Sequence, residues 1–400
     1  MASTPPSAAT PRGNQPKVVW WNDRRYRAIL YQVLVLGGVF LLGWYLVNNT
    51  LTNLASRDIA TGLGFLEREA GFDVSESPIE YSPADTYFRV LVVGVLNTLK
   101  VSIIGIILAT IIGVIAGVAR LSSNWLIAKF ATFYVEGLRN VPVLLQLFFW
   151  YSLITEGLPS PRQAFNPITG VFLSNRGFGI PVPDWGGTMT AMLVALAAGI
   201  LAAWGIARWA RRRQEQTGQI FPSFRIGLAL IIGLPLLAWL IGGAPTAMDA
   251  PELKGFNFQG GATLSPEFAA LLIGLVFYTG TYIAEIVRGG ILAVSHGQTE
   301  AGLALGLRKS LVMRLILLPQ ALRVIIPPLT SQYLNLTKNS SLAVAIGYPD
   351  LVSVANTSIN QTGQAIEGVA IIMLVYLTVS LSISAFMNWY NRRIELKGGR

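Results

Sequence analysis

Charged side chains inside apolar stretches that are long enough to cross a membrane are the first places in this sequence where chemistry is expected. Lys100, Arg139 and Glu285 lie inside such stretches, and Gln146 follows Arg139 by seven residues. A charge at membrane depth costs about 2.5–3.5 kcal/mol or more, so these residues are candidates for a functional role. Lys100 could bind a carboxylate, form an ion pair with Glu285, or extend its stem to the membrane surface.

Two pairs of opposite charges have the spacing of neighbours on one helix face. Glu285 precedes Arg288 by three residues, so the two can pair on one helix face, where a structural or gate-closing ion pair is favoured over substrate binding. Glu136 precedes Arg139 by the same spacing. A further polar cluster near the end of a later apolar stretch consists of Lys338, Asn339 and Ser340. This cluster either lines the mouth of a cavity or marks the end of a helix.

Most catalytic and metal-binding signatures are missing from the sequence. No Lys follows a Gly, which excludes the phosphate-binding loop G-x-x-x-x-G-K and ATP hydrolysis by that route. The chain has no Cys and a single His, His296, so thiolate and His-rich metal sites are excluded as well. We therefore predict no catalytic residue, no metal and no cofactor on this chain.

The elements that carry these residues are predicted to be transmembrane helices. Of the 400 residues 52% are apolar and only 12% are charged, about half the charge of a soluble domain. A membrane helix needs about 20 apolar residues. Stretches that meet this need lie at about 29–47, 88–118, 130–153, 187–207, 226–243, 267–287, 317–337 and 366–388. The predicted fold is an all-α polytopic membrane protein of about eight spans.

The basic residues predict the orientation of the spans. If both termini are cytoplasmic, the inside segments hold 21 of the 30 Lys and Arg residues and the outside loops hold six, in agreement with the positive-inside rule. The net charge of +10 is thus topological, and the basic run at 208–213 is a stop-transfer signal rather than a nucleic-acid site. The acidic outside loop at 48–87 is interpreted as solvated in preference to a docking surface.

The cytoplasmic segment 291–320 is not typical of a loop. Leu303, Leu307 and Leu311 recur every fourth residue among good helix formers, which predicts an amphipathic helix at about 298–311. From the residues alone, such a helix either docks in a groove of a cytoplasmic partner or lies on the membrane surface.

The same segment resembles the EAA motif of ABC importer permeases at every spacing. The matching positions are Glu300, Ala301, Gly302, Gly306, Ile316, Leu318 and Pro319. Gly302 stands where the family prefers Ala. The resemblance implies that this helix couples the chain to a partner ATPase. Gly306 either forms a turn that ends the helix or allows close approach of the partner's backbone.

The flanking stretches are similar to the polar amino-acid uptake group of this family. They are YIAEIVRGGI at 282–291, PQALR at 319–323, KNSSL at 338–342, IGYPDL at 346–351, NTL at 97–99 and RNVPVLLQ at 139–146. The similarity covers about 88–153 and 266–388. The enlarged layout resembles a permease of the general L-amino acid uptake systems of Gram-negative bacteria.

The resemblance implies a type I ABC importer permease core with added helices. The expected organisation is a basic cytoplasmic tail at 1–27, an extra span with the acidic loop at 28–87, core spans at 88–153, an insertion with two spans at 154–265, the core with its coupling helix at 266–388, and a basic tail at 389–400. A zwitterionic L-amino acid would need both anion-binding and cation-binding groups in one cavity, for which Lys100, Arg139, Gln146 and Glu285 are candidates.

The implied partners are a dimeric ATPase that carries ATP and Mg, a second homologous permease, and a periplasmic amino-acid-binding protein. The implied location is the bacterial inner membrane, where lipid surrounds the spans. The alternative is a secondary, ion-coupled amino-acid carrier, which would require buried carboxylates near the membrane midplane. Among the candidates only Glu285 approaches that requirement.

Overall fold

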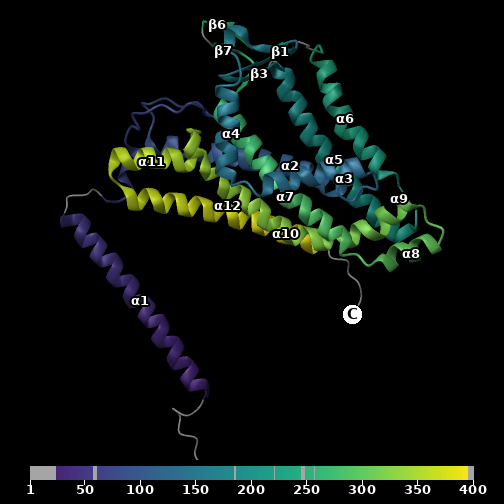
Figure 1. Cartoon of the computed structure of the whole chain (residues 1–400), viewed down its shortest axis with the longest axis horizontal. Coiled ribbons are helices and arrows are strands. Elements are labelled where there is room, and N and C mark those ends of the chain that lie inside the picture. Colours follow the sequence, from purple (N-terminus) through teal and green to yellow (C-terminus); the bar gives the residue numbers. More distant parts are fainter. Residues whose placement is uncertain are drawn as a thin grey trace, which may run out of the picture.

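The computed structural model describes residues 24–56, 61–183, 186–219, 221–244, 248–255 and 257–394, and this part of the chain is mostly helical (Figure 1). The helices are α1 (Arg24–Ser56), α2 (Tyr87–Ala119), α3 (Trp125–Arg139), α4 (Val143–Thr155), α5 (Gly187–Thr217), α6 (Ser223–Ile241), α7 (Pro266–Leu292), α8 (His296–Ala304), α9 (Lys309–Val312), α10 (Leu318–Asn339), α11 (Leu351–Thr362) and α12 (Ala365–Ile394). Short 3-10 turns lie at Leu63–Glu67, Pro161–Gln163 and Ser340–Ile346, and a π turn at Met313–Leu317.

Seven helical segments within these ranges are long and apolar enough to cross a membrane, which confirms the predicted class of membrane protein. They lie within α1, α2, α5, α6, α7, the segment Lys309–Ile346 around α10, and α12. Most of the predicted tail 1–27 lies outside the described residues.

The predicted span at 130–153 is two helices, α3 and α4, rather than one. Pro142 has no backbone N–H, and it disfavours helical backbone at the residue before it, Val141. The helix therefore ends at Arg139 and restarts at Val143. Each half is shorter than the about 20 residues that cross a bilayer. Beside the seven long apolar helices of the described residues, α3 and α4 together are called the broken span.

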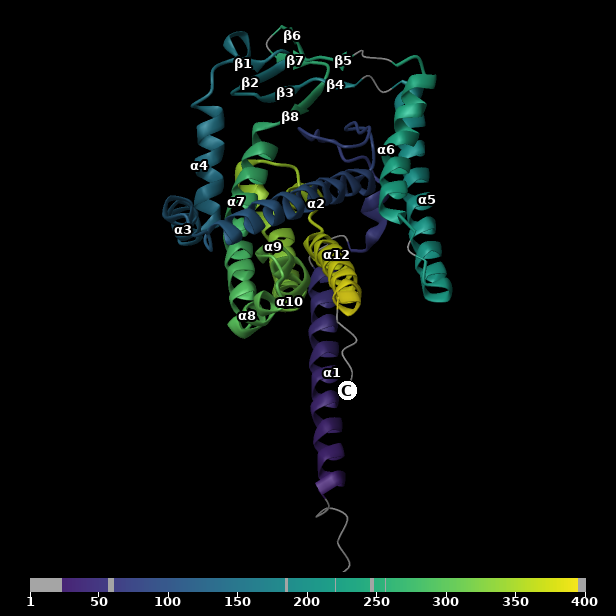
Figure 2. The ribbon, with the colours of Figure 1, turned by 90° about the vertical axis from the view of Figure 1, so that its right-hand side faces the viewer.

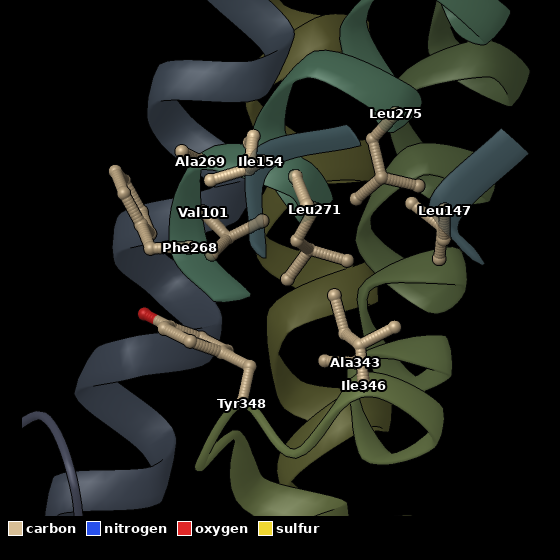
Figure 3. Close-up of a cluster of buried hydrophobic side chains, with 11 residues drawn as sticks. Val101, Leu147, Ile154, Phe268, Ala269, Leu271, Leu275, Ala343, Ile346 and Tyr348 are labelled. Carbon is tan, nitrogen blue, oxygen red and sulfur yellow. The ribbon is translucent and has the colours of Figure 1, made fainter. Parts of the chain in front are cut away.

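A close crossing of α2 and α7 organises the core. A Cβ placed on Gly113 of α2 would lie 2.5 Å from Ile283 of α7, so only glycine allows this approach. Figure 3 shows a buried cluster to which α2, α4, α7 and the turn Ser340–Ile346 contribute side chains, together with Tyr348. Tyr348 and Leu271 are fully buried in this cluster.

The inserted region 154–265 contains short strands that the sequence analysis did not predict. The strands are β1 (Phe165–Ile168), β2 (Val171–Ser174), β3 (Gly177–Ile180), β4 (Val182–Pro183), β5 (Met248–Asp249), β6 (Glu252–Lys254), β7 (Asn257–Gln259) and β8 (Ala262–Leu264). An antiparallel sheet has the order β1-β2-β3-β8, and β8 leads directly into α7. Figure 2 shows the strands and α8 at opposite ends of α7.

The two spans of the insertion, α5 and α6, pack on each other beside the core (Figure 2). Many of their apolar side chains are exposed, as are those of α1, for example Phe40 and Trp44. In a soluble protein such surfaces would be liabilities, whereas lipid covers them in a membrane.

Candidate functional site

The segment between α7 and α10 folds back on itself instead of forming one helix. The predicted helix at about 298–311 is wrong in its extent, because α8 ends at Ala304 and α9 begins at Lys309. Gly306 has a φ of +77° and its N–H donates to the Leu303 carbonyl, while the Leu307 N–H donates to that of Gly302. These two bonds form a Schellman motif, in which glycine takes the left-handed conformation that ends the helix.

The structure explains why this chain has Gly302 where the EAA family prefers Ala. Gly302 is buried, and a Cβ there would lie 2.8 Å from Ile316 and 3.0 Å from Val312. The early and late positions of the motif are therefore in contact across the turn. The bend at Gly306 brings them together, so the motif spacing encodes a folded hook rather than a straight helix.

The outer surface of this hook, residues 296–312, is exposed. Glu300 pairs with His296 at 3.1 Å, and both side chains are largely exposed. Leu305, at the tip of the turn, is 79% exposed, and Leu303 is also exposed. Leu305 was not predicted as a contact residue, because it does not belong to the repeat of Leu303, Leu307 and Leu311. It is exposed because of the turn at Gly306.

An ion-pair cluster joins the ends of α2, α3 and α7 near the hook. The predicted pair of Glu285 and Arg288 is confirmed, at 2.5 Å. Glu285 also accepts a hydrogen bond at 2.6 Å from Arg120, which lies just after α2 and whose side chain is only 12% exposed. Glu136, which has the same i, i+3 spacing to Arg139, instead lies 3.7 Å from Arg120.

Arg139 lies over the ring of Tyr282 on α7, 5.7 Å from its centroid. Lys100 lies over Phe268 on the same helix, at 4.4 Å. The two rings are 14 positions apart on α7, or about 21 Å at 1.5 Å per residue. Lys100 and Arg139 therefore lie at different depths, and the alternative pairing of Lys100 with Glu285 is wrong for the same reason.

The partner of Lys100 is Glu76, in the acidic segment before α2. The Lys100 ammonium donates to Glu76 Oε1 at 2.5 Å, and Ser265 Oγ donates to Oε2 at 2.6 Å. The Glu76 side chain is only 14% exposed. Glu76 therefore anchors the acidic segment to α2 and to the start of α7. At Glu76 the interpretation of this segment as a solvated loop is wrong.

Two of the remaining predicted path residues, Gln146 and Ser340, bond to carbonyls close to them in the chain. Gln146 is buried, and its Nε2 donates to the carbonyls of Leu138 and Val141 at the break between α3 and α4. Ser340 is buried and donates to the Thr337 carbonyl, while Lys338 is exposed at the end of α10. The structure thus distributes the path candidates over several places and does not gather them in one cavity.

Asp350 lies in the stretch IGYPDL, for which the sequence predicted no role of this residue. It is fully buried and caps α11, where its carboxylate accepts hydrogen bonds from the Ser353 N–H at 2.9 Å and the Tyr376 hydroxyl at 3.4 Å. The neighbouring backbone of Pro349 and Leu351 bonds to Asn97 and Thr98 of α2. Two stretches that carry the family resemblance therefore contact each other here.

Burial raises the pKa of the Asp350 carboxyl from 3.8 to about 6, although hydrogen bonds from backbone N–H groups lower it. Because the folded state favours the protonated acid, the contribution of this group to stability is fully present below pH 3.8 and is lost as pH rises through about 6. The shift corresponds to about 2–3 kcal/mol.

We therefore expect Asp350→Asn to raise the melting temperature of the detergent-purified protein at pH 8 and to flatten its pH dependence between pH 5 and 7. The amide oxygen can still accept the capping bond, but it carries no charge to desolvate. Asp350→Ala, the control, loses the cap and is expected to destabilise by about 1 kcal/mol. Identical pH slopes for the wild type and Asp350→Asn would contradict this assignment.

In the described part of the chain, seven long apolar helices and an EAA-type hook between α7 and α10 indicate the membrane-spanning permease subunit of an ABC importer. A family model described as the binding-protein-dependent transport system inner membrane component matches residues 195–396, and the chain belongs to this family. ATP hydrolysis therefore belongs to a separate subunit, and the alternative of a secondary carrier is not supported. Within the described ranges, no group of His, Cys, Asp or Glu could hold a metal ion.

Two relatives are similar over nearly their whole length. The chain is 51% identical over 376 residues to the general L-amino acid transport system permease protein AapQ of Rhizobium johnstonii, which covers 94% of each chain. It is 43% identical to the glutamate/glutamine/aspartate/asparagine transport system permease protein BztB of Rhodobacter capsulatus, over 94% of this chain and 95% of the relative. A crystal structure of an amino acid ABC transporter with histidines matches with a TM-score of 0.45 and 21% identity, over 77% of this chain and 95% of that chain.

Proposed function

We propose that this permease translocates L-amino acids, with polar or broad specificity, across the bacterial inner membrane. The observation that carries the proposal is the hook at 296–312. The contact of the buried Gly302 with Ile316 holds the hook folded, and its exposed outer surface is available to an ATPase subunit. The names of the relatives AapQ and BztB support amino acids as the substrate class. The excess of basic residues on the hook side supports cytoplasmic termini.

The partners in this proposal are a dimeric ATPase that binds ATP and Mg, a second homologous permease, and a periplasmic amino-acid-binding protein. Glu300, Leu303 and Leu305 are the proposed ATPase contacts, because their side chains are exposed on the hook. The insertion 154–265 faces the binding protein through its strands, which lie at the end of α7 opposite to α8 (Figure 2).

Within the membrane we propose Arg139 as the contact for the substrate carboxylate. Arg139 is exposed in the single chain and lies where α3 ends and α4 restarts. A helix that restarts within the membrane presents its N-terminal N–H groups and positive dipole end to an anionic group. Gln146 stabilises the break by donating to the carbonyls of Leu138 and Val141.

We expect uptake of a radiolabelled polar amino acid into proteoliposomes that contain this chain with its ATPase, second permease and binding protein to require ATP hydrolysis. The reason is that the chain lacks a phosphate-binding loop and presents the hook instead. The matched control is the same complex with a hydrolysis-deficient ATPase. Uptake driven by an ion gradient without nucleotide would refute the proposed function.

A further inference from the structure

A small cavity lies between the sheet of the insertion and the acidic segment before α2. Its volume is about 170 Å³. It is lined by Glu76, Arg176, Phe178, Phe258, Thr263 and Ser265, among others. It therefore combines a carboxylate, a guanidinium, hydroxyls and two phenyl rings at the end of α7 where β8 joins the helix, far from the hook (Figure 2).

Glu76 provides a fixed anionic wall to this cavity. Its carboxylate accepts one hydrogen bond from Lys100 and one from Ser265, and its backbone carbonyl accepts another from the Asn97 side chain. An ionised carboxylate has about four acceptor positions, so acceptor capacity remains for a ligand ammonium. Because the side chain is already held in place, little rotamer entropy is lost on binding.

Arg176 provides the opposite charge at the rim. It lies in the two-residue turn between β2 and β3, where its backbone N–H donates to Ser174 Oγ. The guanidinium is exposed and can form a bidentate pair with a carboxylate. A solute with both charges would therefore meet a complementary group at each end.

The size and the apolar wall restrict the ligand further. A volume of 170 Å³ is less than the about 300 Å³ of a cavity for drug-sized ligands, and it corresponds to about six water molecules. Phe178 and Phe258 supply the apolar surface, and Phe258 is stacked at 4.6 Å on Phe172. This description suits one small zwitterion.

We propose that this cavity binds a free α-amino acid, with its ammonium on Glu76 and its carboxylate on Arg176. The substrate class rests on the proposed function. The site is distinct from the proposed contact at Arg139 in the broken span, and it lies on the face that would receive substrate from the binding protein. It would hold the amino acid before the molecule enters the membrane path.

The test is equilibrium binding of L-glutamate to the purified full complex in detergent, without nucleotide or binding protein. We expect saturable binding that weakens at least tenfold in Arg176→Gln and less in Arg176→Lys, which keeps the charge but not the bidentate geometry. Lys254→Gln, on the exposed strand β6 outside the cavity, is the matched control and is expected to bind as the wild type does. Glutarate, which lacks the ammonium group, is expected to bind at least tenfold more weakly than L-glutamate.

Equal affinities of Arg176→Gln and Lys254→Gln, or absence of binding to the wild type, would overturn the site. Binding that is lost in Arg139→Gln but kept in Arg176→Gln would also overturn it, because the ligand would then lie in the membrane. ATP-driven uptake by the wild-type complex is measured separately from binding, so that failure of the site and failure of the proposed function can be distinguished. Normal ATP-driven uptake without binding in the cavity refutes only this site, and binding without ATP-driven uptake refutes only the proposed function.

Discussion

Gly306→Val is expected to lower ATP-driven transport at least tenfold while the protein still inserts into the membrane. Gly306 has a φ of +77° in the Schellman motif that ends α8. A side chain in this left-handed conformation costs about 1–2 kcal/mol, and a β-branched one costs more. Because nothing lies within 4 Å of a Cβ at Gly306, the harm comes from backbone conformation alone. The hook would rearrange, and its outer surface would no longer fit the ATPase.

A substitution series separates this explanation from close approach of a partner. If the left-handed conformation matters, Gly306→Asn is milder than Gly306→Ala, because Asn tolerates that conformation. If the partner's backbone packs on Gly306, the smaller Ala is milder than Asn. For Ala, a cost of 1–2 kcal/mol corresponds to about a 5- to 30-fold loss.

Gly297→Ala is the matched control for this series. Gly297 lies in the same helix, has an ordinary φ, and has room for a Cβ. We expect normal transport in this variant. The measurements are membrane insertion, co-purification of the ATPase, and transport. Normal ATPase association and transport by Gly306→Val would show that the turn is dispensable.

Glu285→Gln is expected to lower the free energy of unfolding by about 2–4 kcal/mol. Glu285 is shared by Arg120 and Arg288, and the Arg120 side chain is only 12% exposed. Loss of the carboxylate would leave a nearly buried guanidinium without its short ion pair. The effect stays below that of a fully buried pair because Glu285 is 33% exposed.

Glu136→Gln is the matched control, since Glu136 contacts the same Arg120 from α3. Its side chain is 67% exposed and its carboxylate is 3.7 Å from the guanidinium. Such pairs are worth less than about 1 kcal/mol. Thermal unfolding of the two variants in one detergent measures the difference. Equal destabilisation would mean that Glu285 is not the group that holds α2 against α7.

The spans were predictable because they depend on local composition. Long apolar runs, such as that of α2, must be helical in lipid, since every backbone N–H and C=O needs a partner within its own segment. The π turn before α10 and the strands of the insertion were not predicted, because short elements leave a weak periodic signal. The break between α3 and α4 was not predicted, because it depends on a single residue, Pro142, within a stretch that is apolar on average.

In the candidate site, too, some contacts were predictable from local spacing and others were not. The Glu285–Arg288 pair was predictable because three residues on a helix fix the distance between two side chains. The pairing of Lys100 with Glu76 was not, because Glu76 belongs to a segment without regular structure. The hook was predictable in its motif spacing, which is local. Its bend at Gly306 was one of two alternatives that the sequence left open.

The sequence by itself predicted the long apolar helices, an orientation with the basic residues on the cytoplasmic side, and the resemblance of the segment at 300–319 to the EAA motif. Only the tertiary structure decided the partners of the membrane charges and the cavity beneath the sheet. The physical reason is that an ion pair such as Glu285–Arg120 joins residues 165 positions apart, and its formation depends on how closely two helices cross. That distance is set by close packing at Gly113, a contact that no run of neighbouring residues can specify.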